Sequence, residues 1–268
     1  MTVFGSQILS PMDVGPRSER TALVAGWFAG RIGADLRLFS VVDDQAEAGI
    51  RQRYLETVAA SIASQFDVAP TCGVSLSDKV ESQLSQALRD DTGVVMATAA
   101  TRLRHDGRFG SIADHVIREA YRPITLIGPE ATSRFTPGPT RIIVPVDGSR
   151  LAERAVPVGG ALAEILDLPL SIVNVKRRAA ADSSPTADNA YVRLLADKLA
   201  QTGVAADYQV IHDSRPPAEV VVSLEEGAVI PVIASHGRSG VQRLVAGSVT
   251  IEVVRAAKWP VMVIPPYM

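Results

Sequence analysis

Short apolar runs alternate along the chain with longer stretches in which apolar residues recur at helical spacing. In the second half, the apolar runs predict strands near 141–146, 170–175, 207–211, 231–235 and 261–264. The stretches between them predict helices near 150–167, 188–202, 216–226 and 248–258. This alternation is typical of βαβ units, in which helices connect parallel strands and cover the sheet. The pattern therefore predicts an α/β fold.

The first half of the chain repeats the second. A shift of 134 residues places Pro11–Asp13 on Pro145–Asp147, and a shift of 137 places Gly110-Ser111 on Gly247-Ser248. Strands are accordingly predicted near 7–11, 36–41, 70–74, 93–98 and 123–127. Two tandem copies of one five-stranded, doubly wound unit explain these shared landmarks.

A change of composition separates the two copies. The segment Gly128–Thr140 is rich in proline, glycine, serine and threonine, which is typical of a linker. We therefore expect one domain at 1–130, a linker at 131–140 and a second domain at 141–268.

The stretch after the fourth strand of the second copy is the most distinctive. Pro231 cannot donate to a sheet ladder, so we expect it at the first residue of that strand. A turn of small residues, Ser235–Gly240, follows the strand, and Gly247-Ser248 opens the next helical pattern. Unpaired amides at a helix N-terminus, together with the helix dipole, favour a phosphate group.

The spacing of His236-Gly237 and Gly247-Ser248, with nine residues between the glycines, resembles the nucleotide-binding signature of the universal stress protein family. That signature is written Gly, two residues, Gly, nine residues, Gly, then Ser or Thr. Ala234 stands at the first glycine here, and it would be strained if the position needed a positive φ. The resemblance implies strand order 3-2-1-4-5 in each domain, helices on both faces of a Rossmann-like sheet, and ATP bound with Mg²⁺ or Mn²⁺.

The resemblance also implies where the nucleotide binds. Strands 1 and 4 flank the switch point of the sheet, so Asp147 and the glycine loop would face each other across one crevice. Asp147 would accept hydrogen bonds from ribose hydroxyls or the adenine amino group, and backbone groups near Val146 and Val175 would contact adenine. The expected contact residues are Pro145, Val146, Asp147, Val175, Ala234, His236, Gly237, Arg238, Gly247, Ser248, Val249 and Thr250.

Several of these residues also fit ordinary structural roles. Asp147 lies in an Asp-Gly-Ser sequence that suits a turn and a helix N-cap. Ser248 and Thr250 fit simple caps, and His236 fits a hydrogen-bonded loop residue without metal partners. Arg238 fits either a phosphate-binding cation or a solvated surface side chain.

The first copy departs from the signature. It keeps Asp13, Gly110 and Ser111, but Ala97 and Ala100 replace the first two glycines. A methyl group at Ala100 would stand where backbone should approach phosphate. We therefore expect the first domain not to bind ATP and to persist as a structural partner.

The ends of the two copies suggest how they associate. Each copy closes with a short uncharged apolar strand, near Ile124–Ile127 and Val261–Ile264. In the order that the resemblance implies, this strand lies at a sheet edge, which is normally covered. Single-domain relatives dimerise through it about a two-fold axis. We expect the two fifth strands to pair antiparallel within one chain as a pseudo-dimer, with a homodimer as a further possibility.

Composition limits the function further. The 268-residue chain has a formal net charge of −2, which argues against broad binding to nucleic acids or anionic membranes. A single cysteine, Cys72, excludes an internal disulfide, and no apolar run suggests a signal peptide or membrane span, so we expect a cytoplasmic protein.

No catalytic residue or protein metal site is predicted, because no acid and base pair accompanies the glycine loop. The expectation is an ATP-binding sensor or regulator of a stress response. The alternatives are an interaction module that binds no nucleotide and a slow ATPase.

Overall fold

The computed structural model describes residues 3–89, 92–97, 111–132, 138–177, 185–224, 228–235, 247–266 and 268. The chain divides between Ile127 and Gly128 into two compact units, three residues before the expected end of the first domain at 130. Each unit has an α/β fold, in which helices cover a β-sheet. Within the described residues, no helix combines the length and the apolar character needed to span a membrane.

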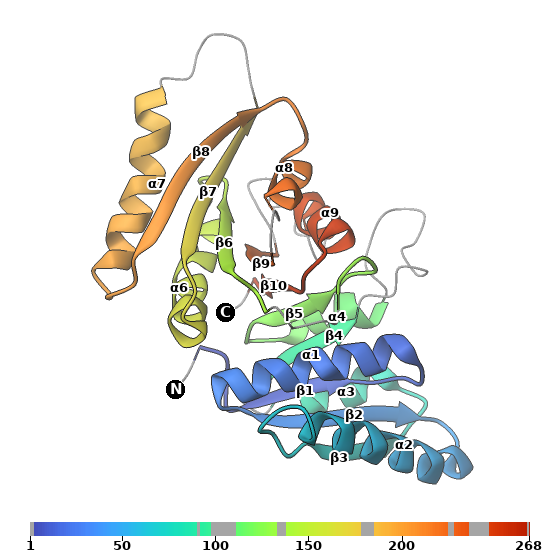
Figure 1. Cartoon of the computed structure of the whole chain (residues 1–268). Coiled ribbons are helices and arrows are strands. Elements are labelled where there is room, and N and C mark those ends of the chain that lie inside the picture. Colours follow the sequence, from blue (N-terminus) through green and yellow to red (C-terminus); the bar gives the residue numbers. More distant parts are fainter. Residues whose placement is uncertain are drawn as a thin grey trace. The chain divides into compact units, whose positions relative to one another are not determined.

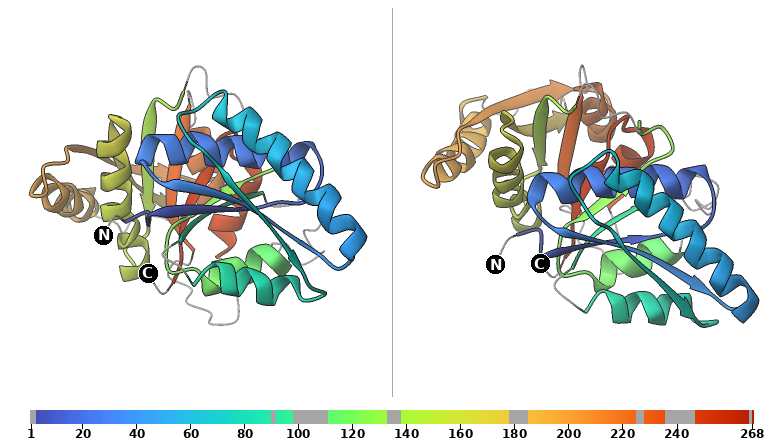
Figure 2. Two further views of the ribbon diagram at one scale, coloured as in Figure 1. Left: turned by 90° about the horizontal axis from the view of Figure 1, so that it is seen from below. Right: turned by 60° about the horizontal axis from the view of Figure 1, so that its bottom comes forward.

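The first unit contains a parallel sheet of five strands in the order β3-β2-β1-β4-β5. Its elements are β1 Gln7–Pro11, α1 Pro16–Ile32, β2 Asp35–Val42, α2 Gln45–Ala63, β3 Thr71–Leu76, α3 Val80–Ala87, β4 Thr92–Ala97, α4 Ser111–Glu119 and β5 Ile124–Ile127. Helices α1 and α2 lie on one face of this sheet and α3 and α4 on the other (Figure 2). The predicted order and the predicted layers are confirmed in this unit.

The second unit repeats this topology in the order β8-β7-β6-β9-β10. Its elements are β6 Arg141–Val146, α5 Arg150–Glu153, α6 Ala155–Leu166, β7 Leu170–Arg177, α7 Pro185–Ala200, β8 Ala206–Asp213, α8 Pro217–Ser223, β9 Val229–Ala234, α9 Ser248–Ala256 and β10 Val261–Ile264. Helices α6 and α7 cover one face, and α8 and α9 cover the other (Figure 1).

The helix after β6 differs from the prediction of one continuous helix over 150–167. It is interrupted at Arg154, between α5 and α6. Pro157 in the first turn of α6 has no N–H to donate to the carbonyl of Glu153, so the hydrogen-bond ladder restarts there. Farther along α6, a Cβ on Gly159 would lie 2.5 Å from Val144 Cγ2, so glycine lets α6 lie close on β6.

Both described ends of the expected linker are bonded to the second unit. The amide of Thr132 donates to Lys258 O at 2.7 Å, and that of Thr140 donates to Ala228 O at 2.6 Å. Ala131 is 2% exposed. The described ends therefore extend the second unit, while residues 133–137 of the expected linker lie outside the described residues.

Candidate functional site

The central strands of the second unit separate at their carboxyl ends. The β6–β9 ladder runs from Arg141↔Val229 to Ile143↔Pro231 and ends there, while β6 stays paired to β7 as far as Val146↔Asn174. Pro145 lies beyond the last β6–β9 pair, where a strand no longer needs an N–H for that neighbour. The two strand ends can therefore diverge and leave room for a ligand at the switch point of the sheet.

Pro231 does not begin its strand, contrary to the expectation. Strand β9 starts two residues earlier, at Val229, and ends at Ala234. Pro231 is in the last pair with β6, and pairing with β10 starts only at Val232. The proline thus falls where one ladder ends and the other begins, so its missing N–H interrupts neither ladder.

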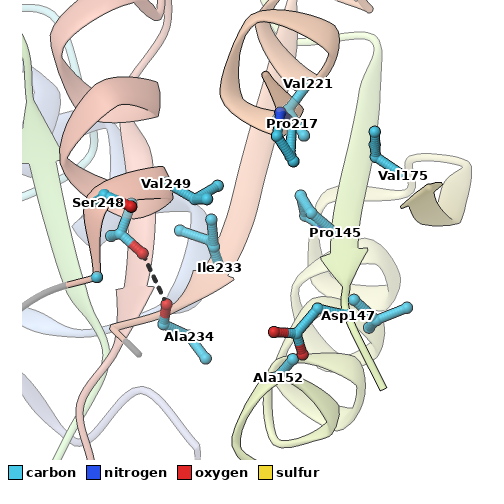
Figure 3. Close-up of a pocket in the computed structure, with 13 residues that line it drawn as sticks. Pro145, Asp147, Ala152, Val175, Pro217, Val221, Ile233, Ala234, Ser248 and Val249 are labelled. Atoms are coloured by element: carbon cyan, nitrogen blue, oxygen red, sulfur yellow. Dashed lines mark hydrogen bonds between the residues drawn. The ribbon is translucent and has the colours of Figure 1, made fainter. Parts of the chain in front are cut away.

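A cavity of about 300 Å³ lies between these strand ends (Figure 3). Its walls are mostly apolar, with Asp147 on the β6 side and the first turn of α9 on the β9 side. It is lined by Pro145, Val146, Asp147, Ala152, Val175, Pro217, Val221, Ile233, Ala234, Gly247, Ser248, Val249 and Thr250. The size falls at the lower end of the range for ligand sites, about 300–1,000 Å³.

The turn after β6 holds Asp147 at this cavity. The Ser149 amide donates to Asp147 Oδ1 at 2.9 Å, and the Ala152 amide donates to Ser149 Oγ at 3.1 Å. Gly148 between them has φ +86°, a left-handed conformation that glycine adopts without strain. The turn and N-cap roles predicted for this sequence are therefore present, and Ser149 rather than Asp147 is the cap. Asp147 also lines the cavity.

The opposite wall is tied together by hydrogen bonds around the end of β9. Gly247 N donates to Ser235 O at 2.6 Å, and Thr250 Oγ1 donates to Ala234 O at 2.9 Å (Figure 3). Gly247 is the N-cap of α9 and no side chain caps that terminus within the described part of the chain, while Ser248 is exposed. The structure thus places the positive end of the α9 dipole at the cavity.

Ala234 causes no backbone strain. Among the non-glycine residues that the structure describes, only Asp167 has a positive φ, and Ala234 lies within strand β9. The strain considered for alanine at this signature position therefore does not arise.

The structure brings most of the predicted contact residues together. Pro145, Val146, Asp147, Val175, Ala234, Gly247, Ser248, Val249 and Thr250 line the cavity. His236, Gly237 and Arg238 lie outside the described residues.

Sequence reasoning missed four lining residues, Ala152, Pro217, Val221 and Ile233. Pro217 and Val221 are four apart on α8, a spacing that places them on one helix face and could have marked them as a wall.

A buried side chain that the sequence did not single out supports the β6 wall of the cavity. Asn174, 2% exposed, donates from Nδ2 to Val146 O at 2.7 Å. The Val146 carbonyl, an expected adenine partner, therefore already accepts one hydrogen bond. Among the described residues, no partner reaches Asn174 Oδ1.

Tyr191, on α7, has a strongly shifted pKa. Burial, reinforced by the nearby Glu153 carboxylate, raises the pKa of Tyr191 on α7 to about 12. This phenol is therefore a poor proton donor near neutral pH. In the described part of the chain, no group of three His, Cys, Asp or Glu side chains is arranged to hold a metal ion.

The signature positions of the first copy are only partly described. Ala97 ends β4 and Ser111 begins α4. Ala100 and Gly110 lie outside the described residues. Asp13 lies two residues after the end of β1, whereas Asp147 directly follows β6, although the two are equivalent in the 134-residue shift.

Comparison with known proteins agrees with this geometry. The sequence model described as universal stress protein family matches residues 139–265. A universal stress protein of Mycobacterium tuberculosis is 30% identical over 172 residues, which cover 60% of this chain and 57% of that protein. One of Bacillus subtilis is 26% identical over 146 residues, which cover 46% of this chain and 97% of the relative. The chain thus spans less than two thirds of the length of the mycobacterial relative.

The solved structures show the same fold over the whole chain. The crystal structure of a universal stress protein from Archaeoglobus fulgidus has a TM-score of 0.72 at 17% identity, covering 97% of this chain and 98% of that one. A protein of unknown function from Pseudomonas aeruginosa has a TM-score of 0.62 at 13% identity, covering 99% of this chain and 94% of that one. Residues 139–265 therefore match the universal stress protein family, and the solved structures show that the whole chain shares the fold of these proteins.

Proposed function

We propose that the second unit binds ATP in the cavity between β6 and β9 and that the protein acts as a sensor or regulator in a stress response. One observation carries this proposal. The cavity brings together a carboxylate, Asp147, apolar walls, and the N-terminus of α9, three features that suit the ribose, the base and the phosphates of an adenine nucleotide.

The parts of the cavity suit the parts of the nucleotide. Ile233, Val175 and Val221 offer apolar surface to the faces of a purine. The Asp147 carboxylate can accept hydrogen bonds from ribose hydroxyls. The amides at the start of α9, together with the helix dipole, can receive the phosphates.

A cavity of about 300 Å³ is small for a whole triphosphate. We therefore assign it to the nucleoside, with the phosphates along the start of α9. His236, Gly237 and Arg238 follow β9 in the sequence and remain proposed contacts on that side. Mg²⁺ or Mn²⁺ would enter bound to the phosphates, where it would neutralise their charge.

The site supports binding better than hydrolysis. Asp147 is the only carboxylate among the lining residues, and it has no general acid or base beside it within that set. Turnover, if present, would be slow. A cytoplasmic location and an intrachain pseudo-dimer of the two units complete the proposal.

Isothermal titration of the full chain with MgATP tests the proposal. We expect one ATP per chain and weaker binding in Asp147→Ala. Asp207→Ala, which removes an exposed carboxylate from β8 of the same unit, is the matched control and should bind as the wild type does. Absence of binding at saturating MgATP would favour an interaction module without nucleotide.

A further inference from the structure

A groove of about 410 Å³ lies between α6 and α7 of the second unit. Its floor is apolar and includes Leu195 and Leu199, which are 5% and 6% exposed. Its charged lining residues are Glu153 from α5, Glu164 from α6 and Lys198 from α7. Among the described residues, the groove and the cavity at the ends of β6 and β9 have no lining residue in common, so the groove is a separate candidate for a ligand site.

The corresponding helices of the first unit, α1 and α2, meet at an equivalent contact. A shift of 134 residues places Gly26 of α1 on Gly160 of α6. A Cβ on Gly26 would lie 2.5 Å from Ile62 Cγ2, and one on Gly160 would lie 2.6 Å from Leu199 Cδ1. In both units, therefore, a glycine on one helix lets a buried aliphatic side chain of the other helix approach closely.

The two units differ in what lies beside this glycine. In the first unit, the Phe66 ring is the next neighbour, with Cδ2 3.1 Å from the position of a Cβ on Gly26. In the second unit, the three atoms nearest to the position of a Cβ on Gly160 all belong to Leu199. The described residues that line the α6–α7 groove include no aromatic one. A phenyl ring thus covers the helix contact in the first unit, and a groove is left at the equivalent place in the second.

The loop after each crossover helix explains this difference. Phe66 is the third residue after the end of α2 at Ala63. The third residue after the end of α7 is Gly203, whose φ of +91° suits glycine and disfavours a side chain. The whole loop between α7 and β8 reads Gln-Thr-Gly-Val-Ala and holds no aromatic residue. A ring for the groove must therefore come from outside this loop.

The same comparison places a carboxylate beside the polar end of a ligand that carries such a ring. Phe66 Cβ lies 3.9 Å from the position of a Cβ on Gly30, near the end of α1. A shift of 134 residues places Gly30 on Glu164. An amino acid whose ring lay as that of Phe66 does would hold its ammonium group near Glu164, and Lys198 lines the same groove for its carboxylate.

We propose that the α6–α7 groove binds a free aromatic amino acid. The ring takes the place that the Phe66 side chain has in the first unit, against Gly160 and the apolar floor. The exposed side chains of Glu164 and Lys198 receive the two charges of the zwitterion. The volume of the groove lies within the range of about 300–1,000 Å³ that ligand pockets have. This site is independent of the nucleotide proposed for the other cavity.

Equilibrium dialysis of the full chain with L-phenylalanine tests the proposal. We expect one phenylalanine per chain in the wild type. Ala161→Trp fills the groove from α6 and should abolish this binding. Ala200→Trp, at an exposed position of α7 outside the lining residues, is the matched control and should bind as the wild type does.

The charged residues give a second test that leaves the floor intact. Glu164→Gln and Lys198→Met should each weaken phenylalanine binding about two- to fivefold, the scale of one exposed ion pair. Arg193→Met, which removes an exposed cation of α7 outside the lining residues, should leave the affinity unchanged. N-acetylphenylalanine amide has the same ring without the two charges, so it should bind more weakly than phenylalanine.

Each outcome supports or overturns the proposal. Absence of phenylalanine binding to the wild type overturns it outright, and unchanged binding in a folded Ala161→Trp variant does the same. If that variant does not fold, unchanged affinity in both Glu164→Gln and Lys198→Met overturns it instead. Tighter binding of N-acetylphenylalanine amide than of phenylalanine would overturn the assignment to a free amino acid and favour an aromatic side chain of a partner protein.

Discussion

Asp147 both shapes the turn after β6 and lines the cavity, and two substitutions separate these roles. Asp147→Asn keeps an Oδ1 acceptor for the Ser149 amide and removes the charge, whereas Asp147→Ala removes both. We expect both variants to weaken ATP binding by about 1–3 kcal/mol, the scale of hydrogen bonds to a charged group. Only the alanine variant should also lose about 0.5–1.5 kcal/mol of unfolding free energy.

Calorimetry with MgATP and urea denaturation measure these two effects separately. Equal affinity for ATP in the wild type and both variants would place the binding site elsewhere.

The shifted pKa of Tyr191 should make the stability of the second unit depend on pH. Its pKa is raised from 10.0 to about 12 in the folded chain, because burial and then the Glu153 charge disfavour the phenolate. A group whose pKa is higher in the folded state stabilises it fully below the unfolded pKa and loses this effect as pH rises. The contribution of Tyr191 should therefore be complete below pH 10 and decline between pH 10 and about 12.

Urea midpoints measured across this pH range check the effect. Tyr191→Phe should show a flatter decline than the wild type, and Tyr208→Phe, at a 42% exposed position of β8, should decline as the wild type does. Parallel curves for all three proteins would contradict the role of Tyr191.

At the scale of elements, the start of α9 is the part of the site where a single substitution should weaken ATP binding most. Gly247 has φ −66° and ψ 154°, an extended conformation that other residues adopt. Valine there should be tolerated by the backbone while its side chain stands where the phosphates meet the helix amides. We expect Gly247→Val to abolish ATP binding while thermal unfolding stays close to that of the wild type.

Adenosine provides a control for this prediction. Because the obstruction lies at the phosphate end, the loss of affinity should be smaller for adenosine than for ATP. An equal loss for both ligands would indicate that the substitution disturbs the whole cavity.

The elements of this fold could be predicted from apolar periodicity because buried parallel strands are short and apolar. β6 and β10 match their expected ranges, and the order 3-2-1-4-5 came from the family resemblance and is confirmed. The interruption of a helix was harder to predict from the sequence. The break at Arg154 depends on Pro157 meeting the carbonyl of Glu153, which apolar spacing does not register.

The site residues that could be predicted are those that lie in a short sequence motif of their own. Asp147 and Gly247 lie at a strand end and a helix start, and both line the cavity. Asn174 could not be identified from spacing, because it acts through a partner from another element. Such a contact becomes visible only in three dimensions.

At the scale of the whole molecule, the differences between the two copies predict that only one of them binds a nucleotide. Asp147 faces a cavity in the second unit, while the equivalent Asp13 is bonded to Arg51 in the first. We expect calorimetry to give one ATP per chain, bound more weakly in Asp147→Ala and with unchanged affinity in Asp13→Ala. Two equivalent sites, or a site lost only in Asp13→Ala, would contradict this division.

The last prediction concerns how the two units associate. Among the described residues of each unit, β5 pairs with β4 alone and β10 with β9 alone. An uncharged apolar strand that has one partner exposes a row of backbone groups that another strand can pair with. The two units are tethered at high effective concentration, so we expect β5 and β10 to pair antiparallel within one chain.

Antiparallel pairing in register would place Thr125 opposite Val263. In a Cys72→Ser background, cysteines at these two positions should form an intrachain disulfide on mild oxidation, since paired strands bring Cβ atoms within bonding range. A cysteine at Tyr208 on β8 in place of the one at Val263 is the control and should not form one. Lysine at both Leu126 and Val263 should separate the units and promote aggregation or exchange between chains. A well-behaved monomer in which the cysteine pair at Thr125 and Val263 never crosslinks would show that the first unit is not retained to cover the edge of the second.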